Sequence, residues 1–309
     1  MSHKDTPSSL KTKKLSFLSQ QLKNTPSLSD LDVVAKSIAQ WDNKACVSED
    51  LILEACCMPY APLLKELVIR AHEKVCHLSC LNKILDGENY DIPSQQKEDA
   101  CRVFLPKVSG KDYVKLMEYI CNSGFAPLCQ EVFDQAKPFL TQEKIAELVT
   151  TVIFGERLNP SPKNDTTVAQ NRAYIVSAIL NDTGHTLENE GIFRVVCRFS
   201  GLEYYLKALI PHFPKQASIN LLSYLLLDHP SMGTDTFDQQ KQPSVVRYLY
   251  EQNKDFWLSY TDPQLEVFVP KRGNPIFWDI HNAYRLQKNL KEGVMESLEN
   301  KPSGFLKKM

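Results

Sequence analysis

The residue of this chain best placed to do chemistry on a partner is Arg194, which follows the short apolar stretch Gly191-Ile192-Phe193. A guanidinium group held just past a tight turn can be presented to a phosphate, because its planar fork of donors matches phosphate oxygens. Ile192 and Phe193 would then anchor the loop that carries it. The alternative interpretation is an ordinary surface arginine beside two core residues.

The segment Glu190-Gly191-Ile192-Phe193-Arg194 resembles the E-G-I-F-R motif of Rho GTPase-activating-protein (RhoGAP) domains. In that family the arginine enters the GTPase active site and stabilises charge on the transferred phosphoryl group, an effect on the order of 10³–10⁵ in rate. The resemblance covers roughly residues 168 to 232. It implies a helical module whose partner is a small GTPase.

The flanks of this motif carry two predicted helices. Upstream, apolar residues at helical spacing over 174–179 lead into 181–184, which predicts a helix end followed by a turn. Downstream, the apolar run 221–227 predicts a second helix. The resemblance implies that Tyr224 and Leu225 in this second helix support the arginine loop.

The chain departs from the family pattern at several positions. Ser223 stands where the family has a lysine, Val196 and Cys197 replace a small residue and a glycine, and no N-x-x-L-A segment follows. A catalytic group misplaced by ~1 Å can cost on the order of 10²-fold in rate. We therefore expect a noncatalytic protein-binding protein. The alternative is a GTPase activator for a Rho-family GTPase with Arg194 as its arginine finger.

A possible metal site consists of His72, Cys76 and Cys80, spaced by four residues on one predicted helix. Zinc could bind three such ligands, but a structural site needs a fourth ligand at tetrahedral geometry. The chain has no C-x-x-C or H-x-x-x-H pair. A buried stripe of cysteines that pack as small hydrophobic residues is the expected alternative, so no metal is predicted.

Motifs for other catalytic chemistry are lacking. Cys56 and Cys57 have no glycine-flanked nucleophile turn around them, and sequence alone does not supply the geometry of a Cys–His pair. Neither of the glycine-rich phosphate-binding motifs, G-x-x-x-x-G-K-[ST] and G-x-G-x-x-G, is present. No cofactor is predicted.

Composition narrows the class of protein further. The 309 residues are 43% apolar and 24% charged, which is typical of a soluble globular protein. Lys+Arg 36 against Asp+Glu 37 gives no field that would attract nucleic acid. No apolar run approaches the length of a membrane span. Nine cysteines without a secretory signal indicate reduced thiols in a cytoplasmic protein.

The expected fold is all-α, because apolar residues recur at helical spacing and prolines separate short helices. Tyr60-Ala61-Pro62-Leu63 recurs 65 residues later as Phe125-Ala126-Pro127-Leu128, each after a predicted helix (50–57 and 112–121). Two such hairpins predict solenoid-like stacking. Four residues would then face a shared core: Leu63, Leu67, Leu128 and Val132. The alternative is independent use of proline in the first turn of a helix.

Five segments are predicted along the chain. They are a flexible basic tail (1–27), a helical-repeat domain (28–155), a proline-containing linker (156–167), a helical C-terminal module resembling a degenerate RhoGAP domain (168–298) and a flexible tail (299–309). Within the C-terminal module we expect helices over 245–250 and 278–298, and an isolated strand or a packed loop over 263–275.

The C-terminus carries a separate signal. Glu292, Glu296 and Glu299 precede Phe305, Leu306 and two lysines, a pattern similar to the export signal of effectors that intracellular bacteria translocate through a type IVB secretion apparatus. The resemblance implies translocation into the host cytoplasm, where the partner would be a small GTPase or another effector. The alternative is a charged helix with a frayed end.

Overall fold

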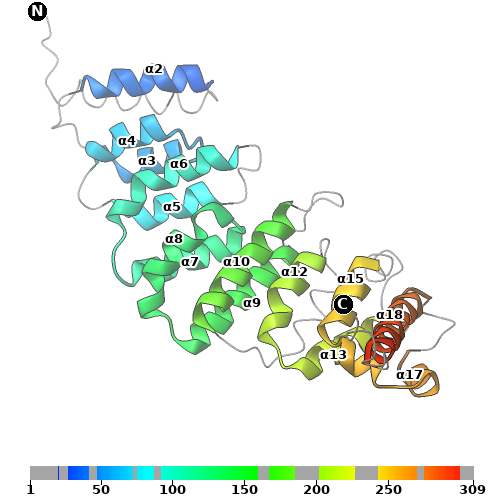
Figure 1. Cartoon of the computed structure of the whole chain (residues 1–309). Coiled ribbons are helices and arrows are strands. Elements are labelled where there is room, and N and C mark those ends of the chain that lie inside the picture. Colours follow the sequence, from blue (N-terminus) through cyan, green and yellow to red (C-terminus); the bar gives the residue numbers. More distant parts are fainter. Residues whose placement is uncertain are drawn as a thin grey trace, which may run out of the picture. The chain divides into compact units, whose positions relative to one another are not determined.

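The computed structural model describes residue 20 and residues 27–41, 47–71, 75–86, 92–158, 167–184, 202–226, 243–269 and 275–299. In this part of the chain the structure is helical, with fifteen α-helices and four short 3₁₀ turns (Figure 1). Its β structure is confined to one bridge between Val47 and Ala71. The all-α prediction is therefore confirmed.

The chain forms two compact units. Unit 1 comprises Met1–Leu158 and Tyr174–Asp182, and unit 2 comprises Asn159–Ala173 and Thr183–Met309. Helix α10 (Thr167–Thr183) therefore contributes residues to both. Residues 159–166, which fall inside the predicted linker, lie outside the described residues.

Unit 1 is built from helical hairpins in two layers. Its helices are α2 (Leu28–Ala39), α3 (Glu49–Cys56), α4 (Ala61–Ile69), α5 (His77–Leu85), α6 (Ser94–Phe104), α7 (Asp112–Ser123), α8 (Cys129–Ala136) and α9 (Gln142–Leu158). Helix α3 packs on α4 and α5, α5 packs on α6 and α7, and α7 packs on α8 and α9. Helix α4 also packs on α2 and α6. Helices α3, α4, α5 and α7 thus contact both a hairpin partner and a helix of a neighbouring hairpin.

The sequence predicts that the two Ala-Pro-Leu hairpins, α3–α4 and α7–α8, stack side by side. They are not direct neighbours, because the α5–α6 hairpin packs between them (Figure 1). Leu63, Leu67, Leu128 and Val132 are all buried. The intervening hairpin gives a weak sequence signal because α6 is mostly polar. Its buried residues are Ala100, Cys101 and Phe104.

A buried arginine links the first helices of unit 1 through hydrogen bonds. The guanidinium of Arg70 donates to the carbonyl of Ala39 at the end of α2 (3.0 Å) and to the carboxylate of Glu66 (2.6 Å). The carbonyl of Arg70 accepts a hydrogen bond from the backbone N–H of Val47 (2.9 Å). One residue therefore joins α4 to α2 and to the segment that precedes α3.

Unit 2 is organised around α15. Its helices are α12 (Leu202–Leu209), α13 (Lys215–Leu226), α15 (Pro243–Gln252), α16 (Lys254–Leu258), α17 (Asp262–Phe268) and α18 (Pro275–Glu299), together with the first part of α10. Helix α15 packs on α12, α13, α16 and α18. Large aromatic side chains fill the core, among them Tyr205, Tyr250, Trp257 and Phe277. Of the helices described in the chain, none has both the length and the apolar character required to cross a membrane.

The predicted strand or loop over 263–275 is wrong for its first half, which forms helix α17. Thr261 and Gln264 cap the start of this helix, since the Thr261 backbone N–H donates to the Gln264 side-chain oxygen (2.9 Å). Pro263 lies in the first turn, where a backbone N–H is not needed for the helix. The β-branched residues near its end leave Val267 exposed and Val269 buried.

Candidate protein-binding surface

The first half of α18 packs against the other helices of unit 2. The Tyr250 hydroxyl shares a hydrogen bond with Nδ1 of His281 (2.9 Å), and the indole N–H of Trp278 donates to the carbonyl of Val269 (3.1 Å). The ring of Tyr250 also stacks on Tyr284, with 5.5 Å between the ring centroids. These contacts fix α18 to α15 and to the end of α17.

The pKa values of the residues that hold α18 are shifted by their surroundings. Burial lowers the pKa of His281, and the nearby charge of Arg285 lowers it further. Burial raises the pKa of Tyr250, and a hydrogen bond to Glu251 raises the pKa of Tyr284. His281 is therefore neutral at pH 7 and its ring sits among aromatic neighbours.

A groove of about 380 Å³ lies between α16 and the middle of α18. It is lined by Lys254, Asp255, Leu258, Ser259, Tyr284, Gln287, Lys288, Lys291 and Glu292. Nζ of Lys254 lies 5.0 Å from the centre of the Tyr284 ring, which is within the range of a cation–π contact. The groove therefore combines three lysines and two carboxylates with one aromatic ring. Its charged lining suits a segment of a protein better than a small apolar ligand.

The part of α18 that includes the wall of the groove has a solvent-exposed surface. Every side chain described from Arg285 to Met295 is exposed. These residues include the apolar Leu286 (61% exposed), Leu290 (60%) and Val294 (56%). Arg285 pairs with Asp262 of α17 at 2.5 Å, so it is the last residue of α18 for which the structure gives an ion pair to another helix.

A second hollow, of about 360 Å³, lies in unit 1 between α8 and α10. Its walls are Gln130, Tyr174, Ser177, Ala178, Asn181 and Asp182. Tyr174 is half-exposed there, and Lys137 pairs with Asp182 at 2.7 Å. This hollow has no lysine or arginine in its lining, so it lacks the cluster of cations that characterises the groove on α18.

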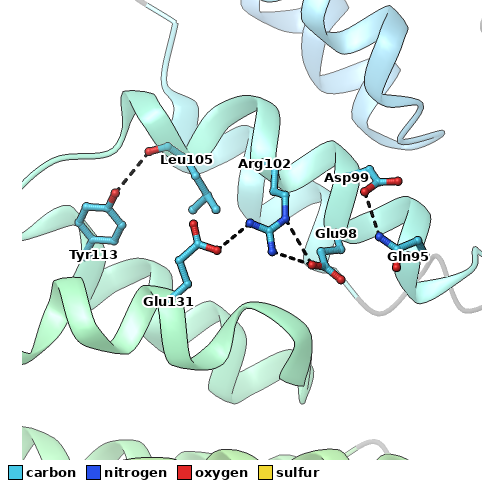
Figure 2. A network of polar contacts seen from close by, with 7 residues as sticks. All are labelled: Gln95, Glu98, Asp99, Arg102, Leu105, Tyr113 and Glu131. Carbon is cyan, nitrogen blue, oxygen red and sulfur yellow. Dashed lines mark hydrogen bonds and ion pairs between the residues drawn. The ribbon is translucent and has the colours of Figure 1, made fainter.

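The polar network in Figure 2 joins two hairpins of unit 1. Arg102 of α6 contacts Glu98 of the same helix (2.7 Å) and Glu131 of α8 (2.8 Å). Its hydrogen bond to Glu98 is the main cause that raises the pKa of Arg102. The charges pair within the network, which positions α6 against α8 and does not form a patch of one sign.

The structure describes only part of the site that the sequence predicts. Ile192, Phe193 and Arg194 lie outside the described residues, and Tyr224 and Leu225 lie in α13 but their side chains are not described. Helix α10 ends at Thr183, as predicted, and Gly184 follows it with left-handed backbone (φ +61°). Whether these five residues come together therefore stays a prediction.

The predicted face of His72, Cys76 and Cys80 does not form, because the helix begins later than expected. Cys76 precedes α5 with extended backbone (φ −81°, ψ 98°) and is exposed, whereas Cys80 is buried. His72 lies outside the described residues. No group of three or more histidine, cysteine or carboxylate side chains in the described ranges could hold a metal ion.

The described cysteines are free, and most are buried. The buried ones are Cys56, Cys80, Cys101, Cys121 and Cys129. Burial raises the pKa of Cys101 to about 12 and that of Cys129 to about 12, so both stay protonated and unreactive at pH 7. Cys46 and Cys197 lie outside the described residues.

The groove was not found from the sequence. The short helix α16 has only five residues, and the helical spacing of Tyr284, Lys288 and Lys291 was the one signal in the sequence that could have indicated this surface. That spacing places an aromatic ring and two cations on one side of a helix. The opposite wall depends on tertiary packing.

No protein-family model matches the chain, and comparison with curated proteins and with solved structures gives no match. The likeness of residues 168–232 to RhoGAP domains therefore stays a prediction that rests on the motif in the sequence.

Proposed function

We propose that this chain is a noncatalytic protein-binding protein that engages its partner through unit 2. The observation that carries the proposal is the groove between α16 and α18, which is lined by Lys254, Lys288 and Lys291 and where Lys254 lies over the ring of Tyr284. The partner is a small GTPase or another effector. This binding takes place in the cytoplasm of a host cell.

The chemistry of the groove defines what it would recognise. Three lysines against Asp255 and Glu292 leave the groove with a net positive charge, although Lys288 lies 4.0 Å from Glu292. This excess of ammonium groups favours a partner segment that carries carboxylates. Tyr284 and Leu258 add apolar area beside these charges. The best fit is an acidic segment of a protein that also carries an apolar side chain.

The sequence supports binding without catalysis. A working RhoGAP needs groups that dock the GTPase and hold the arginine, and here Ser223 replaces the lysine and the N-x-x-L-A segment is missing. The alternative function, a GTPase activator that uses Arg194 as its finger, is supported by the intact E-G-I-F-R motif. The alternative requires that Arg194→Ala abolish stimulated GTP hydrolysis while leaving GTPase binding largely intact.

The test is affinity capture from host-cell lysate, with mass spectrometry of the bound proteins. Wild type is compared with Lys254→Glu/Lys288→Glu/Lys291→Glu, which reverses the three charges of the groove. The matched control is Lys65→Glu/Lys115→Glu/Lys215→Glu, three exposed lysines outside the groove with the same change of net charge.

We expect a discrete partner that wild type and control capture equally and that the groove variant loses at least tenfold. Equal loss in both variants would show that net charge, and not the groove, drives capture. Equal capture by all three proteins would remove the groove from the proposal.

A further inference from the structure

The thiols of two cysteines from neighbouring helices of unit 1 are in contact. Cys56 is the last residue of α3 and Cys80 is the fourth residue of α5. These two helices pack on each other, with Cα atoms that approach within 8 Å. Both cysteine side chains are fully buried, and a hydrogen bond joins their thiols. The packing of α3 on α5 therefore holds two sulfur atoms together that are distant in the sequence.

The two thiols differ in acidity. Their hydrogen bond raises the pKa of Cys56, and burial raises it further. The same hydrogen bond lowers the pKa of Cys80, and burial opposes this effect without cancelling it. The Cys56 S–H is thus the donor and the sulfur of Cys80 the acceptor. Cys80 also lies near the start of α5, where the positive end of the helix dipole favours a thiolate. Cys80 is therefore the nucleophile of the pair.

Two other buried cysteines of unit 1 lack this activation. Cys101 of α6 lies near the pair and adds to the raised pKa of Cys56. Burial raises the pKa of Cys101 itself to about 12, and it raises the pKa of Cys129 in α8 to about 12 as well. Both thiols stay protonated at pH 7. They serve as internal controls for reactivity at Cys80.

From this arrangement we infer that Cys56 and Cys80 form a reversible intramolecular disulfide when the chain is exposed to a hydroperoxide. The Cys80 thiolate attacks one oxygen of hydrogen peroxide and the O–O bond breaks. Cys80 becomes a sulfenic acid, and the hydroxide that leaves takes up a proton to form water. The Cys56 sulfur then attacks the Cys80 sulfur, the S–O bond breaks, and the hydroxyl group leaves as water with the Cys56 proton. The two thiols together lose two electrons, and the peroxide is reduced to two molecules of water.

Burial determines which oxidant reaches the pair and which product forms. Hydrogen peroxide is little larger than water, so a small local opening of α3 or α5 admits it, whereas a bulky thiol such as glutathione is excluded. The sulfenic acid at Cys80 therefore reacts with Cys56. The new bond covalently joins α3 to α5, which belong to successive hairpins of unit 1. The site is independent of the groove, which lies in unit 2.

Peptide mapping of the oxidised full chain tests the inference. The protein carries Cys57→Ser and Cys76→Ser, which remove the two described cysteines that are not fully buried. It is treated with hydrogen peroxide in its native state, denatured, alkylated, and digested without reductant by trypsin and a glutamate-specific protease. We expect one disulfide-linked pair of peptides that contains Cys56 and Cys80 and that dithiothreitol separates. Cys101 and Cys129 should remain open to alkylation.

The same oxidation in concentrated urea is the control, because unfolding separates the two helices. The native sample should contain at least about tenfold more of the linked peptides, since packing raises the effective concentration of one thiol at the other. Equal linkage in both samples overturns the inference, and so does native protein in which Cys56 and Cys80 both stay open to alkylation. Circular dichroism shows whether the background variant keeps its helices. If it does not, the wild-type chain is mapped and fragmentation locates the link.

The roles of the two sulfur atoms are tested in the same background with dimedone, which traps sulfenic acids. Cys56→Ser removes the second thiol, so Cys80 should accumulate as the sulfenic acid and give a dimedone adduct. Cys80→Ser removes the nucleophile, so Cys56 should give none. An adduct at Cys56 but not at Cys80 would overturn the assignment of Cys80 as the nucleophile.

Discussion

At the scale of single residues, burial decides which polar contacts matter. Arg70 is buried and donates to a backbone carbonyl of α2 and to Glu66, whereas Arg102 makes two ion pairs but stays 49% exposed. When a buried donor is removed, the buried oxygen atoms that accepted its hydrogen bonds are left without a partner. When one member of an exposed ion pair is removed, water solvates the other member. The two arginines should therefore differ in their effect on stability.

We predict that Arg70→Met lowers the free energy of unfolding of unit 1 by about 1–3 kcal/mol. The matched substitution Arg102→Met should lower it by less than about 1 kcal/mol, because that pair faces solvent. Urea denaturation followed by circular dichroism measures both. Equal losses would show that burial of Arg70 does not set its contribution.

His281 gives unit 2 a dependence on pH. Its pKa in the folded chain is below the ordinary value of about 6.5, so the unfolded chain binds more protons as the pH falls through that value. This contribution to stability is complete above about pH 6.5 and is lost on acidification toward the folded pKa.

We predict that wild-type unit 2 loses more thermal stability between pH 7.5 and pH 5.5 than the variant His281→Phe. The variant also loses the hydrogen bond to Tyr250, so it melts lower at pH 7.5, and the informative quantity is the difference between the two pH values. Thermal melts at both values measure it. The same difference in both proteins would exclude His281 as the source.

At the scale of helices, α18 combines a buried first half with a second half whose described side chains are exposed. Gly293 lies in the second half, where a glycine costs about 1 kcal/mol relative to alanine and a Cβ atom would have open space. We predict that Gly293→Ala slows hydrogen exchange of the amides around it by roughly fivefold in 2 µM protein. Unchanged exchange would mean that this part of α18 is stabilised by contacts other than its own helical hydrogen bonds.

Helices with strong apolar spacing were predictable, and those shaped by local or tertiary effects were not. The predicted helix over 278–298 is α18, which spans Pro275–Glu299. Helix α17 was missed because the run Val267-Phe268-Val269 reads as a strand, while a capped start at Thr261 and Pro263 favours a helix. The start of α5 was placed too early because sequence spacing does not reveal that Cys76 is extended.

At the scale of the whole molecule, the sequence predicts an all-helical chain, and the structure adds the hairpin order of unit 1 and the groove of unit 2. The groove could not be predicted, since one wall is α18 and the other is α16, and their contact depends on the aromatic packing around Tyr250 and Trp257. The loop that the sequence predicts around Arg194 is the opposite case. It is visible as a motif, and it lies outside the described residues.

The central claim is that the chain binds a partner protein without catalysing its reaction, and single-turnover GTP hydrolysis tests it most directly. Preloaded Rho-family GTPases are mixed with excess wild-type chain or with Arg194→Ala, and phosphate release is followed against the GTPase alone. The account predicts that neither protein changes the rate. Robust stimulation by wild type that Arg194→Ala abolishes, with GTPase binding retained, would contradict it and establish Arg194 as an arginine finger.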